Sequence, residues 1–235
     1  WQNKKVFLMG LSIVTVNLNN IAGLKKTGQS VALYAKGAVE WIVIDGGSSD
    51  GSIESLAKVQ VGRFRYISEP DKGIYDAMNK GRRLAQTEHI LFLNSGDVLS
   101  GSLNCDTVSA GLIPVACSAG QVQTSIFNDS TRMPYCHQGI VYPAKNIGDF
   151  DIRWRLASDF DHYLKYRESI CLNWIEQAQK SCVVLLEPNG VSQVQWVRRE
   201  IEIFRICISR GELFWALSWM KVRLRKLGVR IWNFL

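Results

Sequence analysis

The stretch Ile90–Leu99, which reads ILFLNSGDVL, decides how the rest of the chain is interpreted. Residues Ile90–Leu93 are all apolar and show no helical period, so they predict a buried strand. The strand ends at once in the run Asn94–Asp97, whose residue types are common in any turn. In an open parallel sheet, however, ligands bind at this end of the strands. The stretch therefore predicts either an ordinary turn or a ligand-binding carboxylate at Asp97.

The chain before this stretch alternates strand and helix in the same way. We expect strands at 11–16, 40–45, 64–67 and 90–93, with helices from after Asn20 to about Ala35, at 53–59 and at 74–85. Such alternation predicts a parallel sheet with right-handed crossovers. Three of the four strands run into an acidic or polar turn at the same edge, which favours the ligand-binding interpretation.

Two familiar nucleotide-binding motifs are missing from the sequence. A Rossmann site needs GxGxxG after the first strand, and the chain has Asn17-Leu-Asn-Asn20 there. A phosphate loop of the form GxxxxGK[ST] is absent as well. The predicted sheet therefore resembles a nucleotide-binding one that uses carboxylates in place of a glycine-rich phosphate cradle.

Composition limits the classes of protein to consider. The 235 residues suffice for one large α/β domain or a domain with an appendage, and 47% hydrophobic with 21% charged residues is globular composition. The six cysteines form no CxxC pair and do not combine with the three histidines at zinc-ligand spacing, so we expect free thiols in a reducing cytosol. The apolar run Val6–Val16 resembles a signal peptide but lacks a small-residue cleavage site. No segment reaches the roughly 18 uncharged apolar residues of a membrane span.

Positive charge is concentrated at the carboxyl end. From Trp196 to Leu235 there are nine Lys and Arg against three Glu, which gives +6 of the total +7. A nearly neutral main body argues against nucleic acid as a partner. Beyond Gly211 an apolar stripe recurs at helical spacing, with Trp and basic residues on the other side. Its members are Leu213, Leu217, Met220, Leu224, Leu227, Ile231 and Leu235, and the other side carries Trp215, Trp219, Arg223, Lys226 and Arg230.

This stripe allows two interpretations. It packs on the parent domain or on a second copy, or residues 212–235 lie in an anionic membrane surface.

Four segments, taken in order, resemble glycosyltransferase family 2 in the GT-A fold, with the closest similarity to bacterial exopolysaccharide enzymes of the colanic-acid type. They are Ser12–Asn17 (SIVTVN), Glu40–Ser52 (EWIVIDGGSSDGS), Glu69–Gly81 (EPDKGIYDAMNKG) and Leu93–Asp97 (LNSGD). The similarity resumes at His137–Gly139 and Ala157–Asp161. It implies an α/β fold, a mostly parallel Rossmann-like sheet flanked by helices, with a C-terminal amphipathic helical appendage. We expect a GT-A domain over 1–190, with a nucleotide-sugar half at about 1–100 and an acceptor half at about 101–190, and basic helices over 191–235.

The resemblance also implies a set of site residues. Asp97 would hold Mg²⁺ or Mn²⁺, and Asp45 would hold the uracil or ribose of the donor, although Asp45 also suits a turn. The remaining nucleotide-sugar residues implied are Asp50, Glu69, Asp71, Lys72, Gly73, Tyr75, Asp76, Asn79 and Asn94. Many relatives have a second acid at the position of Gly96. With one carboxylate fewer, metal affinity is in question, but Mg²⁺ tolerates one or two carboxylates beside substrate phosphates.

The second half should supply a general base that deprotonates the acceptor hydroxyl. A helix that starts near Ser158 would place Asp159 in its first turn, where a carboxylate is stabilising in any helix. The resemblance favours Asp159 as the base, with Asp161 in reserve. Two residues apart on a helix, they face different ways and cannot serve equally. His137 is either a structural histidine or a contact to acceptor or donor phosphate.

Together these features predict an inverting, metal-assisted hexosyltransferase of bacterial surface polysaccharide synthesis. Its donor would be a nucleotide diphosphate sugar and its acceptor a saccharide or a polyprenyl-linked sugar. We expect it in the cytoplasm, peripheral on the inner face of the plasma membrane. The alternatives are a non-catalytic GT-A-like partner subunit and a sugar-nucleotide pyrophosphorylase. The latter needs a Gly-rich, Arg-containing loop after the first strand, which the sequence lacks.

Overall fold

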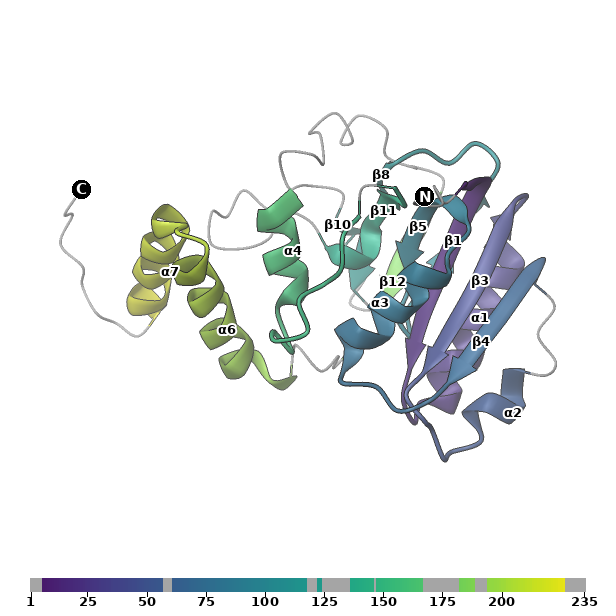
Figure 1. The fold of residues 1–235 in the computed structure, drawn as a ribbon, viewed down its shortest axis with the longest axis horizontal. Coiled ribbons are helices and arrows are strands. Elements are labelled where there is room, and N and C mark those ends of the chain that lie inside the picture. The colour runs from purple at the N-terminus through teal and green to yellow at the C-terminus, as the bar shows by residue number, and fades with distance from the viewer. Residues whose placement is uncertain are drawn as a thin grey trace, which may run out of the picture.

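The computed structural model describes residues 6–56, 61–117, 122–123, 136–145, 147–166, 182–188 and 194–226, with backbone alone at 117, 122–123 and 222–226. A central sheet carries helices on both faces, and a group of helices extends from one side of it toward the carboxyl end of the chain (Figure 1).

The main sheet has six strands in the order β4-β3-β1-β5-β11-β8. Neighbours among β4, β3, β1 and β5 run parallel, β11 is antiparallel to β5, and β8 is antiparallel to β11. The strands are β1 (Leu8–Asn17), β3 (Val39–Asp45), β4 (Arg63–Ser68), β5 (Thr87–Phe92), β8 (Gly111–Leu112) and β11 (Ile140–Pro143). The predicted mostly parallel α/β sheet is therefore confirmed.

Successive side chains of β1 point to opposite faces of the main sheet, and each face has its own apolar core. Leu11 and Ile13 belong to the core that includes Leu24 and Val31 of α1 (Ile21–Tyr34). Val14 and Val16 belong to the core that includes Met78 of α3 (Ile74–Leu84). The two helices thus cover opposite faces of the sheet because successive strand side chains point to opposite sides. A short helix, α2 (Ser52–Leu56), follows β3.

A second, smaller sheet lies on the α1 side and has the order β10-β9-β12-β6. Its strands are β6 (Val98–Ser100), β9 (Val115–Cys117), β10 (Val122–Gln123) and β12 (Val183–Leu186). β6 begins directly after the turn Asn94–Asp97, and β12 pairs with it antiparallel. The short strands β2 (Ala35–Lys36) and β7 (Leu103–Asn104) pair separately, and a single 3₁₀ turn, η1 (His137–Gly139), precedes β11.

Three helices form the carboxyl-terminal group: α4 (Ser158–Tyr166), α6 (Trp196–Ser209) and α7 (Leu213–Lys226). Phe160 and Leu164 of α4 share an apolar cluster with Ile206 of α6 and Ala216 of α7. Glu202 of α6 accepts hydrogen bonds from backbone N–H groups just before α4, at Arg155, Leu156 and Ala157. A carboxylate at a helix N-terminus is stabilising, so α6 fixes where α4 begins.

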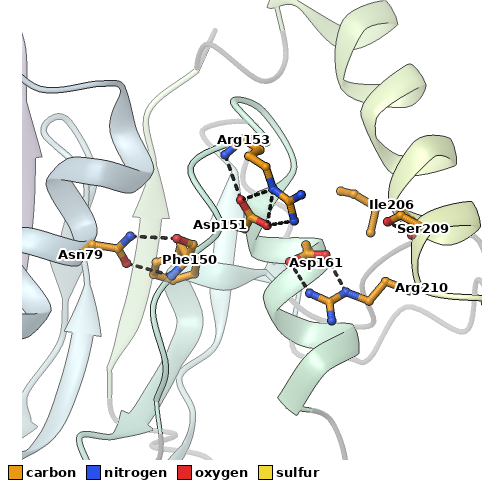
Figure 2. Close-up of polar contacts among 8 residues, drawn as sticks. All are labelled: Asn79, Phe150, Asp151, Arg153, Asp161, Ile206, Ser209 and Arg210. Atoms are coloured by element: carbon orange, nitrogen blue, oxygen red, sulfur yellow. Dashed lines mark hydrogen bonds and ion pairs between the residues drawn. The ribbon is translucent and has the colours of Figure 1, made fainter.

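A partly buried ion pair adds to this contact between α4 and α6. The carboxylate of Asp161 accepts two hydrogen bonds from the guanidinium of Arg210, each 2.7 Å long (Figure 2). The side chain of Asp161 is only 4% exposed and that of Arg210 is 31% exposed. Bidentate pairs of this kind fix orientation as well as distance.

The described part of α7 packs on the domain through the side that the sequence places opposite its apolar stripe. Trp215 packs against Phe160, with ring centroids 5.5 Å apart, and Trp219 donates its indole N–H to Glu200 at 2.8 Å. Leu213 and Leu217, which belong to the stripe, are 63% and 48% exposed. The larger indole rings therefore cover the domain, because they bury more apolar area than leucine does. None of the helices in the described part of the chain could serve as a membrane span.

We predict that breaking the Asp161–Arg210 pair loosens α4 from α6. Arg210→Met leaves a buried carboxylate unpaired and should lower the free energy of unfolding by roughly 2–3 kcal/mol, less than for a fully buried pair because Arg210 is partly exposed. Asp161→Asn should cost a similar amount, and the double variant should cost at least ~1 kcal/mol less than the sum. Urea unfolding of the four proteins measures this, and strict additivity would contradict a direct pair.

Candidate active site

Four parallel strands end along one edge of the main sheet, and the loops that follow them form the candidate site. Strand pairing sets Asn17 beside Asp45 and Asp45 beside Ser68, so the ends of β1, β3 and β4 lie level. β5 continues alongside β1, where the N–H of Ser95 donates to the carbonyl of Val16 at 3.1 Å. The polar turns predicted from the sequence therefore meet at one edge, where a parallel sheet binds ligands.

Asp45 is fully buried at the end of β3 and joins three strand ends. Its Oδ1 accepts hydrogen bonds from Asn17 Nδ2 at 2.8 Å and Ser48 Oγ at 2.5 Å. Its Oδ2 accepts from the backbone N–H groups of Gly47 and Ser48 and from the hydroxyl of Ser68. Burial acts to raise the pKa of Asp45, but the hydrogen bonds, led by the one from Ser48, hold it below its ordinary value. The carboxylate thus organises the turn, and its contact with a nucleotide stays a prediction.

Asp50 connects the loop after β3 to the start of α1. Its Oδ2 accepts the backbone N–H of Ile21 at 2.8 Å, and its Oδ1 accepts the N–H and hydroxyl of Ser52 at 3.0 and 2.5 Å. These bonds, first the one from the Ser52 hydroxyl, lower the pKa of Asp50. The residue therefore fixes the starts of α1 and α2, and nucleotide contact is again untested.

The segment between β4 and α3 forms a second loop beside the first. A Cβ placed on Gly46 would lie 2.6 Å from Asp71 Oδ2, so the two loops are in contact. Asp71 accepts the N–H of Gly73 at 2.7 Å, and Gly73 has a φ of +118° that favours glycine. Other predicted residues of this loop take part in local pairs: Lys72 N–H donates to Asp76 at 3.0 Å, and Glu69 pairs with Lys80 at 2.7 Å.

The turn that contains Asp97 is held from behind by α1. Thr27 Oγ accepts the N–H of Gly96 at 2.9 Å and donates to the carbonyl of Asp97 at 2.7 Å. Asp97 itself is only 5% exposed, and its Oδ1 accepts the N–H of Glu187 at 2.8 Å. Burial raises the pKa of Asp97 to about 7, against the lowering effect of that hydrogen bond. In the same turn, Asn94 Oδ1 is buried and has no hydrogen-bond partner among the described atoms.

These oxygens suit a divalent cation that is held only partly by protein. Within the described ranges, no group of three or more His, Cys, Asp or Glu residues gathers where it could hold a metal ion. Mg²⁺ and similar cations are often bound by one or two carboxylates together with substrate phosphates and water. The carboxylate of Asp97 and the unpartnered amide oxygen of Asn94 are hard donors of the right kind. The site therefore fits a cation that arrives with a phosphorylated ligand.

Asp159 lies in the first turn of α4 and is linked to the sheet through Tyr75. The hydroxyl of Tyr75, on α3, donates to Asp159 Oδ1 at 2.9 Å across 84 positions of sequence. Burial raises the pKa of Asp159, while the hydrogen bond from Tyr75 acts to lower it. The same environment raises the pKa of Tyr75, chiefly through burial, so Tyr75 is the donor. A carboxylate with a raised pKa and one hydroxyl partner is suited to accept a proton.

The structure separates Asp159 from Asp161. Asp161 is engaged by Arg210, as described above, so its oxygens are committed to holding α4 against α6. Asn79 is also used structurally: its amide both donates to the carbonyl and accepts from the N–H of Phe150, each at 2.8 Å (Figure 2). This pair fastens α3 to the segment that leads into α4. Direct roles of Asp161 and Asn79 toward substrate stay predictions.

His137 lies within a buried group of aromatic rings. Its Nδ1 is 2.9 Å from the hydroxyl of Tyr142, and its ring stacks on Phe92 with centroids 5.3 Å apart. Its Nε2 is buried and has no partner among the described residues. Burial lowers the pKa of His137 to about 4, so the ring is neutral at physiological pH. This environment matches a structural histidine, and contact with donor or acceptor remains untested.

Several residues that shape the site were not singled out from the sequence. Asn17 Oδ1, beside Asp45, is buried without a partner in the described part of the chain and is available to a ligand donor. Thr27, Glu202 and Arg210 act through contacts made only after folding. No local pattern marks them, because each is an ordinary helix residue until its tertiary partner is known.

Comparison with known proteins finds sequence similarity mainly in the first hundred or so residues. Residues 12–103 match the model of glycosyl transferase family 2. An uncharacterized glycosyltransferase of Mycobacterium tuberculosis is 42% identical over 92 residues, which cover 39% of this chain and 35% of the relative. A PGL/p-HBAD biosynthesis glycosyltransferase of Mycobacterium bovis is 29% identical over 181 residues, covering 66% of this chain and 68% of the relative. The chain thus spans about a third of the first relative and two thirds of the second.

Solved structures share the fold at low sequence identity. TarS 1–349 of S. aureus in complex with UDP-GlcNAc has a TM-score of 0.60 at 15% identity, covering 85% of this chain and 66% of that one. Mannosyltransferase PcManGT from Pyrobaculum calidifontis, in complex with GDP-Man and Mn²⁺, has a TM-score of 0.59 at 12% identity, covering 89% and 67%. Glucosyl-3-phosphoglycerate synthase from Mycobacterium tuberculosis, with Mn²⁺ and UDP, has a TM-score of 0.56 at 11% identity, covering 86% and 80%. The fold is therefore GT-A, as the sequence predicts.

Proposed function

Residues 12–103 of this chain belong to glycosyl transferase family 2, and on that premise we propose that the protein transfers a glycosyl residue from a nucleoside diphosphate sugar to an acceptor hydroxyl. The observation that carries the proposal is a pair of carboxylates in different surroundings, of which Asp97 is buried and Asp159 is partly buried. Asp97 closes the turn that follows core strand β5, a turn that also contains the unpartnered Oδ1 of Asn94, and Asp159 lies in the first turn of α4 beside the Tyr75 hydroxyl. One suits a cation and the other suits a proton.

The donor would bind along the carboxyl edge of β1, β3, β4 and β5. Structural relatives of the same fold are described in complex with UDP, UDP-GlcNAc or GDP-Man, which supports a nucleotide sugar but leaves the base and sugar open. The loops that carry Asp45 and Asp71 are in contact with each other, so a nucleotide here would meet both. Their hydrogen bonds are already made before a ligand arrives, which reduces the ordering that binding requires.

Asp97, with the nearby oxygens, would hold Mg²⁺ or Mn²⁺ against the diphosphate. Two of the relatives are described with Mn²⁺. A divalent cation in this position neutralises the charge that develops on a diphosphate leaving group. The protein's part is to keep the Asp97 turn rigid, which Thr27 does from α1 through its hydroxyl.

Asp159 would act as the general base of an inverting transfer. The acceptor oxygen bonds to the anomeric carbon, the bond from that carbon to the diphosphate oxygen breaks, and the acceptor proton passes to Asp159. A base with a raised pKa holds that proton more strongly, and general-base assistance is typically worth roughly 10²–10⁴ in rate. The hydroxyl of Tyr75 orients the carboxylate, since it donates to Oδ1 at 2.9 Å.

The acceptor would be a saccharide or a polyprenyl-linked sugar of a bacterial surface polysaccharide, reached from the cytoplasmic face of the membrane. Support comes from exposed apolar side chains on α6 and α7, which include Ile201, Ile208, Leu213, Phe214 and Leu217. The basic residues Arg223 and Lys226 lie in the last turns of α7, with their side chains outside the described part, and Arg230 lies outside the described residues. Apolar side chains beside basic ones match an anionic membrane surface.

We predict that Asp97→Asn removes metal-dependent donor binding. A thermal-shift screen of UDP-, GDP- and dTDP-sugars with Mn²⁺ first identifies the nucleotide that binds. Asn keeps the Oδ1 acceptor for the Glu187 N–H but loses the charge, so the variant should fold normally. It should lose the difference in nucleotide affinity with and without Mn²⁺, measured by calorimetry. Equal nucleotide affinity with and without Mn²⁺ in both proteins would contradict the metal role.

We predict that Asp159→Asn lowers kcat for transfer by roughly 10² or more with little change in the donor KM. Tyr75→Phe should keep measurable activity but remove a hydrogen bond that lowers the pKa of Asp159. The acid limb of its kcat/KM profile should therefore move to higher pH, because the base must be ionised to act. A larger loss from Asp161→Asn would reverse the two assignments. Near-normal rates in all three variants would place the base elsewhere.

We predict that α7 docks the enzyme on anionic membranes. Charge reversal at Arg223, Lys226 and Arg230 should weaken binding to phosphatidylserine-containing liposomes about a hundredfold, because each charge contributes about 1 kcal/mol. Leu213→Ser with Leu217→Ser should also weaken it, by at least roughly tenfold. Donor hydrolysis should stay unchanged in both variants.

The matched control is Leu33→Ser on α1, where the leucine is 58% exposed on another part of the molecule. This variant should bind liposomes like the wild type. Retention of the charge-reversed protein on liposomes would contradict the docking, and so would an equal loss in the Leu33 control.

A further inference from the structure

Gly96 stands next to Asp97 where a second acid is common in the resembled family, and its missing side chain leaves space that another residue fills. A Cβ at Gly96 would overlap Oε2 of Glu187. Gly96 also has a φ of +103°, in the region that favours glycine. The turn is therefore shaped to receive the Glu187 side chain rather than to carry one of its own.

Strand pairing explains how Glu187 reaches this position. β12 runs antiparallel to β6, with Val184 opposite Leu99 and Leu185 opposite Val98. Continued by two residues, this register sets Glu187 opposite Gly96. The N–H of Glu187 donates to Asp97 Oδ1 at 2.8 Å, across 90 positions of sequence, which fixes the residue against the turn. The placement of Glu187 thus follows from the sheet rather than from a flexible loop.

The charges around Glu187 leave a requirement for a cation. Glu187 and Asp97 are two acidic side chains that interact repulsively at this turn. Lys26 attracts Asp97 electrostatically, but in the described part of the chain no Lys or Arg forms an ion pair with either carboxylate. The side-chain contact to Glu187 is a long one, 3.4 Å from Asn20 Nδ2. Neighbouring carboxylates without an ion-pair partner favour a bound cation.

We propose that Glu187 supplies the carboxylate that Gly96 lacks, so that the divalent cation of the donor site is held by Asp97 and Glu187 from two different strands. This inference rests on the proposed function, because it concerns the cation that accompanies the donor. The two carboxylates are within the number that Mg²⁺ or Mn²⁺ takes from protein when phosphates complete the set. Glu187 would then replace the carboxylate that is missing at Gly96.

A simpler role for Glu187 is to stabilise the start of α1, where Asn20 is the N-cap residue. The two roles differ in what they predict. A purely structural glutamate would affect the melting temperature with or without metal. A metal ligand would affect the binding of the cation, and its replacement would relieve repulsion when metal is absent.

The test is direct measurement of Mn²⁺ binding, by the loss of the free-Mn²⁺ electron paramagnetic resonance signal, with UDP, GDP or dTDP present. Glu187→Gln should weaken Mn²⁺ binding by at least about tenfold, and Glu187→Asp should recover part of that loss. The melting temperature of Glu187→Gln in EDTA should equal or exceed that of the wild type. The matched control is Glu88→Gln, which removes an exposed carboxylate at the opposite end of β5.

The outcomes separate this inference from the proposed function. If the wild type binds Mn²⁺, Asp97→Asn abolishes it and Glu187→Gln binds like the wild type, Glu187 is not a ligand and the donor site stands. A fall in melting temperature in EDTA without loss of Mn²⁺ binding would assign Glu187 to α1. If the wild type binds no Mn²⁺ with any of the three nucleotides, the proposed metal-assisted function itself fails.

Discussion

The hydrogen bonds to Asp45 are the interaction on which the rest of the site depends. One buried carboxylate receives donors from Asn17 at the end of β1, from the loop after its own strand and from Ser68 at the end of β4. A buried charge is costly unless its acceptors are filled, and here five donors from three strand ends fill them. The carboxyl edge of the sheet is therefore ordered before any ligand binds. The ends of β1, β3 and β4 are held together at this edge.

The two halves of the chain are joined through α3. The Tyr75 hydroxyl donates a hydrogen bond to Asp159 in α4. The Asn79 amide forms two hydrogen bonds with the backbone of Phe150, in the segment before α4. From the other side, Glu202 and Arg210 of the carboxyl-terminal helices hold the same helix. Residues that the sequence assigns to an appendage thus help to position the proposed base. The position of the proposed base Asp159 therefore depends on the packing of the carboxyl-terminal helices.

Much of the fold could be predicted from the sequence, because apolar strands followed by polar turns are local patterns. The strands around Leu11–Val16 and Glu40–Asp45 and the helix near Ser158 are present within a few residues of their predicted bounds. The gathering of the turns followed from the geometry of parallel strands. What could not be predicted depends on partners distant in sequence: Arg210 for Asp161, Phe150 for Asn79 and the β6–β12 register for Glu187. The same holds for α7. The spacing of its apolar residues predicts a stripe along the helix, but it does not show which side of the helix packs on the domain.

The central claim is that the edge formed by Asp97 and its neighbouring loops holds a nucleotide diphosphate together with a divalent cation. Crystals of the protein grown with Mn²⁺ and the nucleoside diphosphate that binds best, measured at the manganese absorption edge, test it most directly. The account predicts an anomalous peak within coordination distance of the Asp97 carboxylate and of the diphosphate, with the nucleoside over the Asp45 and Asp71 loops. A nucleotide bound away from the carboxyl edge of β1, β3 and β5, or a manganese peak remote from Asp97, would contradict it.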